Sequence, residues 1–178
     1  ASCNKRLMLL VTAVGFEQKM IEGADRDEKN QGGQMAYIKA LWEAVNTNDS
    51  LDLLVTIDDG AQQSLSVCSL VVANAAPFTT VLAQGGGEPD AKDGQLDLTW
   101  IPPQTSMSEH MFSLSELIVP NVFVDAENKN VHHQRIKKII INAEQPLNYV
   151  IDGETYQDEA LDIRINPSSL TMLIAPQQ

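Results

Sequence analysis

The sequence predicts a mainly β fold: an antiparallel two-sheet β-sandwich with one or two helices at an edge. Residues 161–166 alternate apolar and polar side chains, which is typical of a strand with one buried and one wet face. Short loops between seven to nine expected strands favour antiparallel pairing. Tight turns are indicated by Asp-Gly pairs, because glycine adopts positive φ at no steric cost; the pairs stand at 59–60, 93–94 and 152–153.

The N-terminal half is expected to hold three strands and one helix. An apolar stripe at i, i+3, i+4 and i+7 from Ile38 predicts the helix, over 34–46. The polar stretch 22–33 before it is interpreted as an exposed loop. One strand is expected to begin with the apolar run 7–11 and to end at 14–16, and two more are expected over 51–57 and 64–74.

The C-terminal half continues the same pattern. A strand over 96–101 ends at two prolines, and a short helix is expected over 108–117. Apolar, β-branched residues between 136 and 150 lead to the turn at 152–153. Leu170, Met172 and Ile174 extend the alternation beyond 166 and predict a last strand.

Composition places the chain among ordinary globular domains. Its 178 residues are 43% hydrophobic and 20% charged, enough for one domain with a sizeable core. A formal net charge of −12 would repel a phosphate backbone, so nucleic acid is not an expected partner. No apolar run approaches the about 20 residues of a membrane span. Cys3 and Cys68 lack metal-ligand spacing and are expected to be reduced thiols of a cytoplasmic protein.

A glycine-rich stretch precedes the strand at 96–101. Gly85, Gly86 and Gly87 permit backbone conformations that other residues avoid, but no Gly-Lys-Ser/Thr follows, so this is not a Walker phosphate loop. Asp90 and Asp93, with nearby main-chain carbonyls, are donors that suit a hard cation such as Mg²⁺. By spacing alone they are more typical of solvated turn residues than of a metal site.

The turn at 152–153 places Asp152 on a rigid corner, with Glu154 two residues further on the same side. By spacing alone an Asp-Gly pair between strands is far more typical of a plain turn than of a site. The pattern offers no nucleophile elbow of the Gly-x-Ser-x-Gly type. The three histidines, including His132 and His133, lack zinc spacing and are interpreted as surface residues.

Nine segments in this order resemble the C-terminal β-sandwich of the diacylglycerol kinase family, which includes bacterial soluble lipid kinases and, more distantly, sphingosine and ceramide kinases. The segment 74–85 departs from the compact family pattern, so its loop is expected to have a different shape. The segments that carry the resemblance are 11–16, the expected helix with Tyr37, 71–74, 85–89, 93–97, 136–139, 151–154, 161–167 and 170–176.

The resemblance implies a two-domain lipid kinase, of which residues 1–178 are the C-terminal, substrate-side domain. Family members bind ATP in an N-terminal domain with a Gly-Asp-Gly-Thr motif, which these residues lack. The chain alone is therefore expected to be inactive. The implied partners are its own nucleotide-binding domain and a membrane lipid such as diacylglycerol, met from the cytoplasm at the inner membrane surface.

The resemblance also implies roles for single residues. Asp152 matches the aspartate proposed to accept the proton of the lipid hydroxyl, and Glu154 would support it or touch a bridging water. Asp93 matches a ligand of a structural Mg²⁺, with main-chain oxygens near Asp90 and Gln95 completing its shell. ATP and Mg²⁺ are thus the implied cofactors.

Two other functions fit the same residues. The chain could be a non-catalytic lipid-binding or regulatory module that has kept the fold without the chemistry. It could also be an assembly domain, in which a sheet edge or the helix with Trp42 forms a homodimer.

Overall fold

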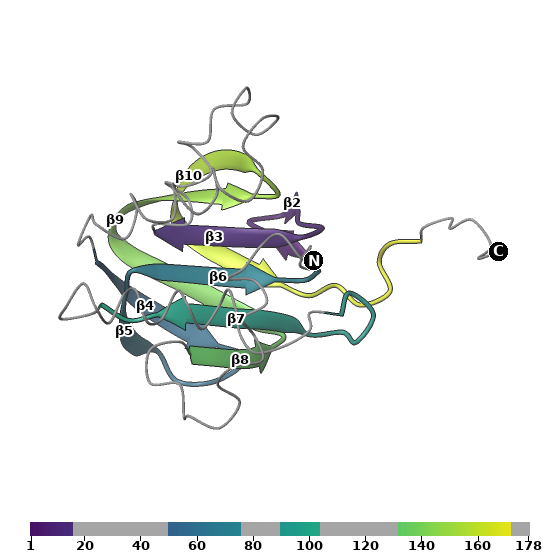
Figure 1. Ribbon diagram of the computed structural model, residues 1–178, viewed down its shortest axis with the longest axis horizontal. Coiled ribbons are helices and arrows are strands. Elements are labelled where there is room, and N and C mark those ends of the chain that lie inside the picture. Colours follow the sequence, from purple (N-terminus) through teal and green to yellow (C-terminus); the bar gives the residue numbers. More distant parts are fainter. Residues whose placement is uncertain (16–49, 76–89, 104–131, 172–178) are drawn as a thin grey trace, which may run out of the picture.

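The computed structural model describes residues 1–15, 50–75, 90–103 and 132–171. This part of the chain contains ten strands and no helix (Figure 1). The strands are β1 (Ser2–Cys3), β2 (Arg6–Leu7), β3 (Val11–Gly15), β4 (Leu51–Ile57), β5 (Gln63–Val67), β6 (Ser69–Ala73), β7 (Leu96–Ile101), β8 (His132–Ile136), β9 (Lys138–Ile151) and β10 (Glu154–Arg164).

All strand pairs are antiparallel, which confirms the mainly β prediction. The order is β2-β1-β10-β9-β3-β6-β7-β8, with β4 attached to β9 and β5 to β4. Hydrogen bonds therefore join all ten strands into one sheet, whereas the sequence predicted two. The predicted helices, 34–46 and 108–117, lie outside the described residues.

Strand β9 organises this sheet because it changes partner along its length. It pairs with β4 through Ile139–Ala143 and with β3 through Tyr149–Ile151. Between these stretches its register with β10 shifts, where 143–146 stand opposite Glu159. Pro146 falls inside this bulge, where a missing N–H costs no ladder hydrogen bond.

The strands that pair with either end of β9 contribute side chains to one hydrophobic core. In Figure 1, β4 and β5 lie behind β6, β7 and β8, as expected if the sheet curls at β9. None of the described segments forms a helix long and apolar enough to cross a membrane. The buried core comprises Cys3, Met8, Val14, Leu53, Val55, Val67, Leu70, Val72, Leu96, Leu98, Ile136, Ile139, Ile141, Leu147, Tyr149, Ile151, Leu161 and Ile163.

Two predicted strands are interrupted in the structure. The run 7–11 is split between β2 and β3, because the amides of Leu9 and Leu10 turn toward a side chain. The run 64–74 is split at Cys68, whose N–H donates to the Ile101 carbonyl. There the chain leaves β4, the partner of β5, and joins β3 and β7, the partners of β6.

Two further differences concern the C-terminal half. The strand β8 was not predicted, and its His132 stacks on Trp100 with ring centroids 5.0 Å apart. The last predicted strand is not confirmed where it can be seen, since Leu170 is exposed and outside any strand. Residues 172–178 lie outside the described part.

Candidate active site at the β9–β10 turn

Asp152 occupies the tight turn between β9 and β10 with a φ of 50°. Its Oδ2 accepts a hydrogen bond from the Leu9 amide at 2.7 Å, and its Oδ1 accepts the amides of Leu10 and Val11, each at 2.9 Å. Its own amide donates to the Val11 carbonyl at 3.0 Å. A carboxylate has about four acceptor positions, so one on Oδ2 is left for another donor. The side chain is exposed and held in one orientation.

Asp58 repeats this arrangement at the other end of β9. It too has a φ of 50°, its Oδ1 accepts the amides of Lys137 and Lys138 at 2.8 and 2.9 Å, and its amide donates to the Lys138 carbonyl. Both aspartates stabilise a backbone connection by receiving its amides. This geometry is therefore a structural device of the fold in the first place, and it identifies no site without a further observation.

The backbone that holds Asp152 is itself fixed from the other side. The Asn74 side chain donates to the Leu9 carbonyl at 2.9 Å, and the amides of Asn74 and Ala75 donate to the Leu10 carbonyl. Asn74 is 8% exposed, and its Oδ1 has no partner among the described residues. The connection between β2 and β3 is thus bound on both sides, by Asp152 and by Asn74.

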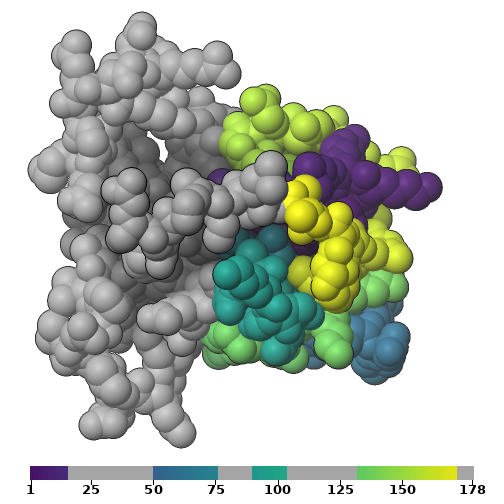
Figure 2. Space-filling model, turned by 90° about the vertical axis from the view of Figure 1, so that its right-hand side faces the viewer, coloured from purple at the N-terminus to yellow at the C-terminus, as the bar shows by residue number. Residues whose placement is uncertain are grey.

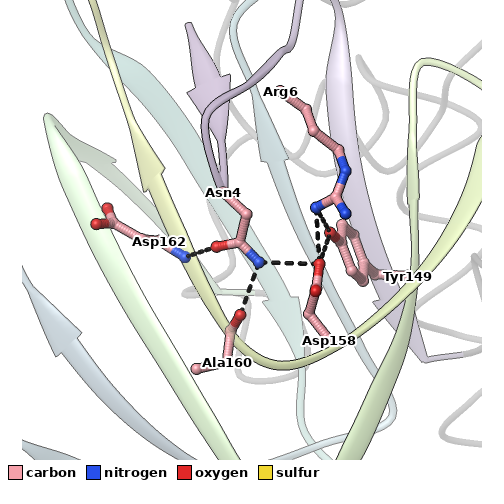
Figure 3. A network of polar contacts seen from close by, with 6 residues as sticks. All are labelled: Asn4, Arg6, Tyr149, Asp158, Ala160 and Asp162. Carbon is pink, nitrogen blue, oxygen red and sulfur yellow. Dashed lines mark hydrogen bonds and ion pairs between the residues drawn. The ribbon is translucent and has the colours of Figure 1, made fainter.

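A polar network ties the β1–β2 hairpin to β9 and β10 (Figure 3). Asp158 Oδ2 accepts hydrogen bonds from Tyr149 at 2.5 Å, Asn4 at 3.1 Å and Arg6 at 2.7 Å. Asn4 also donates to the Ala160 carbonyl. The hydrogen bonds from Tyr149 and Asn4, and then Arg6, hold the pKa of Asp158 below its usual range. Burial, followed by the hydrogen bond to Asp158, raises the pKa of Tyr149.

Glu154 begins β10 opposite Ile151 and is exposed. It lies two residues beyond Asp152, as the sequence indicated, so the two carboxylates belong to one turn. Gly153 between them has a φ of 94°. The turn chemistry predicted from the Asp-Gly pair is therefore confirmed.

The loop before β7 carries the residues predicted to bind a metal. Asp90 Oδ1 accepts the Lys92 amide at 2.9 Å, and Asp93 Oδ1 accepts the Gln95 amide at 2.8 Å. Asp93 Oδ2 lies 3.3 Å from the Arg135 guanidinium. Among the described residues, no three His, Cys, Asp or Glu side chains gather closely enough to hold a metal ion. A cation here would need main-chain oxygens and would compete with Arg135.

A buried carboxylate next to this loop was not singled out by the sequence. Asp97 is 2% exposed, and its Oδ1 lies 2.8 Å from His133 Nε2 and 3.7 Å from Arg135 Nε. His133 is half-buried, which corrects its interpretation as a surface residue. Asp97 and His133 stand on adjacent strands, and their contact depends on the β7–β8 register.

The Asp152 turn and the Asp93 loop lie at one end of the sheet but not in one cluster. Val11, next to Asp152, is in register with Ala73, which is in register with Asp97. Since neighbouring strands are about 4.8 Å apart, three strand spacings separate Asp152 from Asp97, about 14 Å, and the Asp93 loop leads into the same strand as Asp97. Gly85, Gly86 and Gly87 lie outside the described residues.

Comparison with known protein families decides what fold this is. The family model of the YegS C-terminal, NAD kinase β-sandwich-like domain matches residues 11–174. The chain belongs to this family.

The YegS C-terminal domain is also similar to part of a longer protein. An uncharacterized protein of Synechocystis sp. is 34% identical over 178 residues, and the match covers 97% of this chain and 40% of that protein. The chain thus spans less than half the length of this relative.

Solved structures show the same fold in Bacillus anthracis. A candidate diacylglycerol kinase of that organism superposes with a TM-score of 0.62 at 19% identity, covering 95% of this chain and 56% of the other. A second structure gives 0.61 at 17% identity, with coverages of 90% and 51%. The resemblance stated from the sequence, to the C-terminal domain of the lipid kinase family, is confirmed at this level.

Sequence reasoning located the turn of this YegS C-terminal domain but missed its surroundings. The amides of Leu9, Leu10 and Val11 stand more than 140 positions before Asp152. Asn74 follows a buried strand and carries no motif that would link it to Leu9. A weak signal existed for Asp58, which also begins an Asp-rich turn after an apolar strand.

Proposed function

We propose that the chain is the C-terminal domain of an ATP-dependent lipid kinase that phosphorylates the hydroxyl of a membrane lipid such as diacylglycerol. The family assignment and the fold shared with the candidate diacylglycerol kinases support this proposal. ATP would be held by an N-terminal domain of the longer protein, and the sheet end with Asp152 would form the far wall of the cleft. The lipid would be reached from the cytoplasmic side of the membrane.

Within the family assignment, the observation that carries the proposal is the orientation of the Asp152 carboxylate. Three backbone amides hold it, and one acceptor position on Oδ2 remains at an exposed surface. A lipid hydroxyl that donates to this position would have its oxygen aimed away from the domain, toward an incoming phosphoryl group. In a loose phosphoryl-transfer transition state, such orientation matters more than early removal of the proton.

Asp152 would take the hydroxyl proton as the oxygen–phosphorus bond forms and the bond to the leaving ADP breaks. The three amides would keep the carboxylate in place during this step, since they bind it before and after the transfer. Glu154, exposed on the same turn, would hold a water next to the hydroxyl.

The proposal also includes a Mg²⁺ ion bound at the loop before β7. The carboxylate and carbonyl oxygens around Asp93, Asp90 and Gln95 are ligands of the type that this cation prefers. The ion would stiffen the loop before β7 and neutralise its carboxylates. Because this loop leads into β7, which stands three strand spacings from Asp152, the role of the ion would be structural.

The test compares two variants in the longer, two-domain protein. Asp152→Asn and Asp58→Asn each replace one acceptor oxygen by an amide nitrogen next to backbone donors, so each is expected to cost about 1–3 kcal/mol of stability. Only Asp152→Asn is expected to lose turnover, by at least about a hundredfold, with diacylglycerol and ATP as substrates. Equal turnover in both variants would assign Asp152 a purely structural role.

That outcome would favour a non-catalytic lipid-binding or regulatory module. A specific observation keeps this alternative open, namely that Asp58 uses the same geometry at the opposite end of β9. Transfer of phosphate that depends on Asp152 and not on Asp58 would remove the alternative.

A further inference from the structure

Three leucine side chains are exposed within four consecutive positions of the N-terminal segment. Leu7 is 64%, Leu9 42% and Leu10 40% exposed, while Met8 between them is fully buried. Single exposed leucines are common on protein surfaces, whereas neighbouring ones mark an interaction site. The segment stands at the surface of the molecule, beside the residues near 165–171 (purple and yellow in Figure 2). We call these three residues the leucine patch.

The leucine patch stands on a rigid support. The hairpin before it is tied to β10 by Asn4 and Arg6, which both donate to Asp158 (Figure 3). The carbonyls and amides of Leu9 and Leu10 are bound by Asn74 and Asp152. Because backbone hydrogen bonds fix the segment on both sides, the side chains cannot turn inward without breaking them. Their exposure is therefore built into the fold.

The patch also adjoins the proposed catalytic carboxylate. The amides of Leu9 and Leu10 lie 2.7 and 2.9 Å from the Asp152 oxygens. A lipid whose hydroxyl reaches Oδ2 would carry its acyl chains past these side chains. Apolar surface at that place would lower the cost of drawing the lipid out of the bilayer.

We propose that Leu7, Leu9 and Leu10, with the adjacent Lys5, dock this domain on a phospholipid bilayer by inserting into the boundary between head groups and acyl chains. The inference rests on the proposed function for the identity of the bilayer as partner. Lys5 is exposed next to the patch and suits lipid phosphates. A net charge of −12 opposes adsorption by charge alone, so apolar contacts supply the affinity.

A second copy of the chain fits the patch less well. A stable dimer buries at least about 1,200 Å² of surface in total, far more than three leucine side chains offer. Weak apolar contacts with a bilayer also suit a kinase that must leave the membrane after it has released its product.

The experiment measures sedimentation of the full 178-residue chain with phosphatidylcholine vesicles, with and without phosphatidylglycerol, in the absence of nucleotide. We expect binding that Leu9→Ser and Leu10→Ser each weaken about tenfold, since each removes one buried leucine. Leu54→Ser is the matched control: Leu54 is 46% exposed but lies on β4, against the other end of β9. Lys5→Gln is expected to weaken binding only to vesicles with phosphatidylglycerol.

No binding by the wild-type chain, or equal losses in Leu9→Ser and Leu54→Ser, would overturn the docking surface. Self-association that the leucine variants abolish while vesicle binding persists would assign the patch to a second copy and overturn it too. The two proposals fail separately. Turnover on detergent-dispersed diacylglycerol that depends on Asp152, without vesicle binding, would leave the kinase function standing and remove the docking surface.

Discussion

Asp152 and Asp58 explain why an aspartate tolerates a left-handed backbone in this fold. Both have a φ of 50°, where a side chain other than that of glycine is strained. In each case the carboxylate receives two or three amides from a connection that is distant in sequence. Hydrogen bonds to an ionised acceptor are stronger than neutral ones and offset the strain. The aspartate proposed to be catalytic and a structural one therefore share one value of φ.

Asp158 gives a prediction about pH at the same scale. Its pKa is lowered by hydrogen bonds from Tyr149 and Asn4, and by Arg6, so the ionised form stabilises the fold. The stability advantage of wild type over Asp158→Asn should be complete above the ordinary aspartate value of about 3.9. It should fall as the pH drops below that value through the lowered pKa.

The measurement is urea denaturation of both proteins between neutral and acid pH, with an expected difference of about 1–2 kcal/mol at neutral pH. Glu159→Gln, an exposed neighbour on β10, serves as the control and should show little difference. A difference between wild type and Asp158→Asn that persists unchanged in acid would contradict the network.

At the scale of elements, two glycines with similar φ show that a positive φ and a lack of room for a side chain are separate reasons for glycine. Gly15 ends β3 with a φ of 92°, and Gly153 lies in the β9–β10 turn with a φ of 94°. A Cβ on Gly15 would lie 2.2 Å from the Cys68 carbonyl oxygen, whereas a Cβ on Gly153 would meet nothing within 4 Å. The first glycine is required by packing as well as by φ, and the second by φ alone.

We therefore expect Gly153→Ala to cost about 1 kcal/mol and Gly15→Ala about 3 kcal/mol or more. The backbone of Cys68 cannot move easily, because its amide is bonded to Ile101 where the chain passes from β5 to β6. Urea denaturation would measure both costs from the shift in midpoint, provided that the dependence of the unfolding free energy on urea concentration is unchanged. Equal costs would mean that β3 and Cys68 do not approach as described.

At the scale of the whole molecule, β9 is the element on which the sheet depends. It contacts β10 throughout most of its length, β4 at one end and β3 at the other. Its bulge at 143–146 allows one strand to serve both halves of the core.

The Mg²⁺ proposal predicts a change in the stability of the whole molecule. Thermal unfolding in millimolar Mg²⁺ should occur about 2–4 °C above that in EDTA, because a ligand that binds only the folded state stabilises it. Asp93→Asn should abolish this difference. Arg135→Gln should enlarge it, since the guanidinium no longer competes for Asp93. Identical unfolding of the wild type in both solutions would mean that the loop binds no Mg²⁺ in this chain.

Local patterns in the sequence determined the mainly β class, the strand over 96–101 and the glycine turns at 93–94 and 152–153. Alternation with a period of two and the conformational freedom of glycine act between near neighbours, so they can be read from the chain itself. The order of the segments that carry the resemblance was also enough to identify the family.

Only the tertiary structure decided what surrounds Asp152. Three features depend on strands that are distant in sequence. They are the amides that hold Asp152, the same arrangement at Asp58, and the exposure of Leu9 and Leu10. The division of the run 7–11 into two strands has the same cause, because the amides between β2 and β3 bond to Asp152 and not to a neighbouring strand. Such contacts are set by register and strand order, which no local pattern specifies.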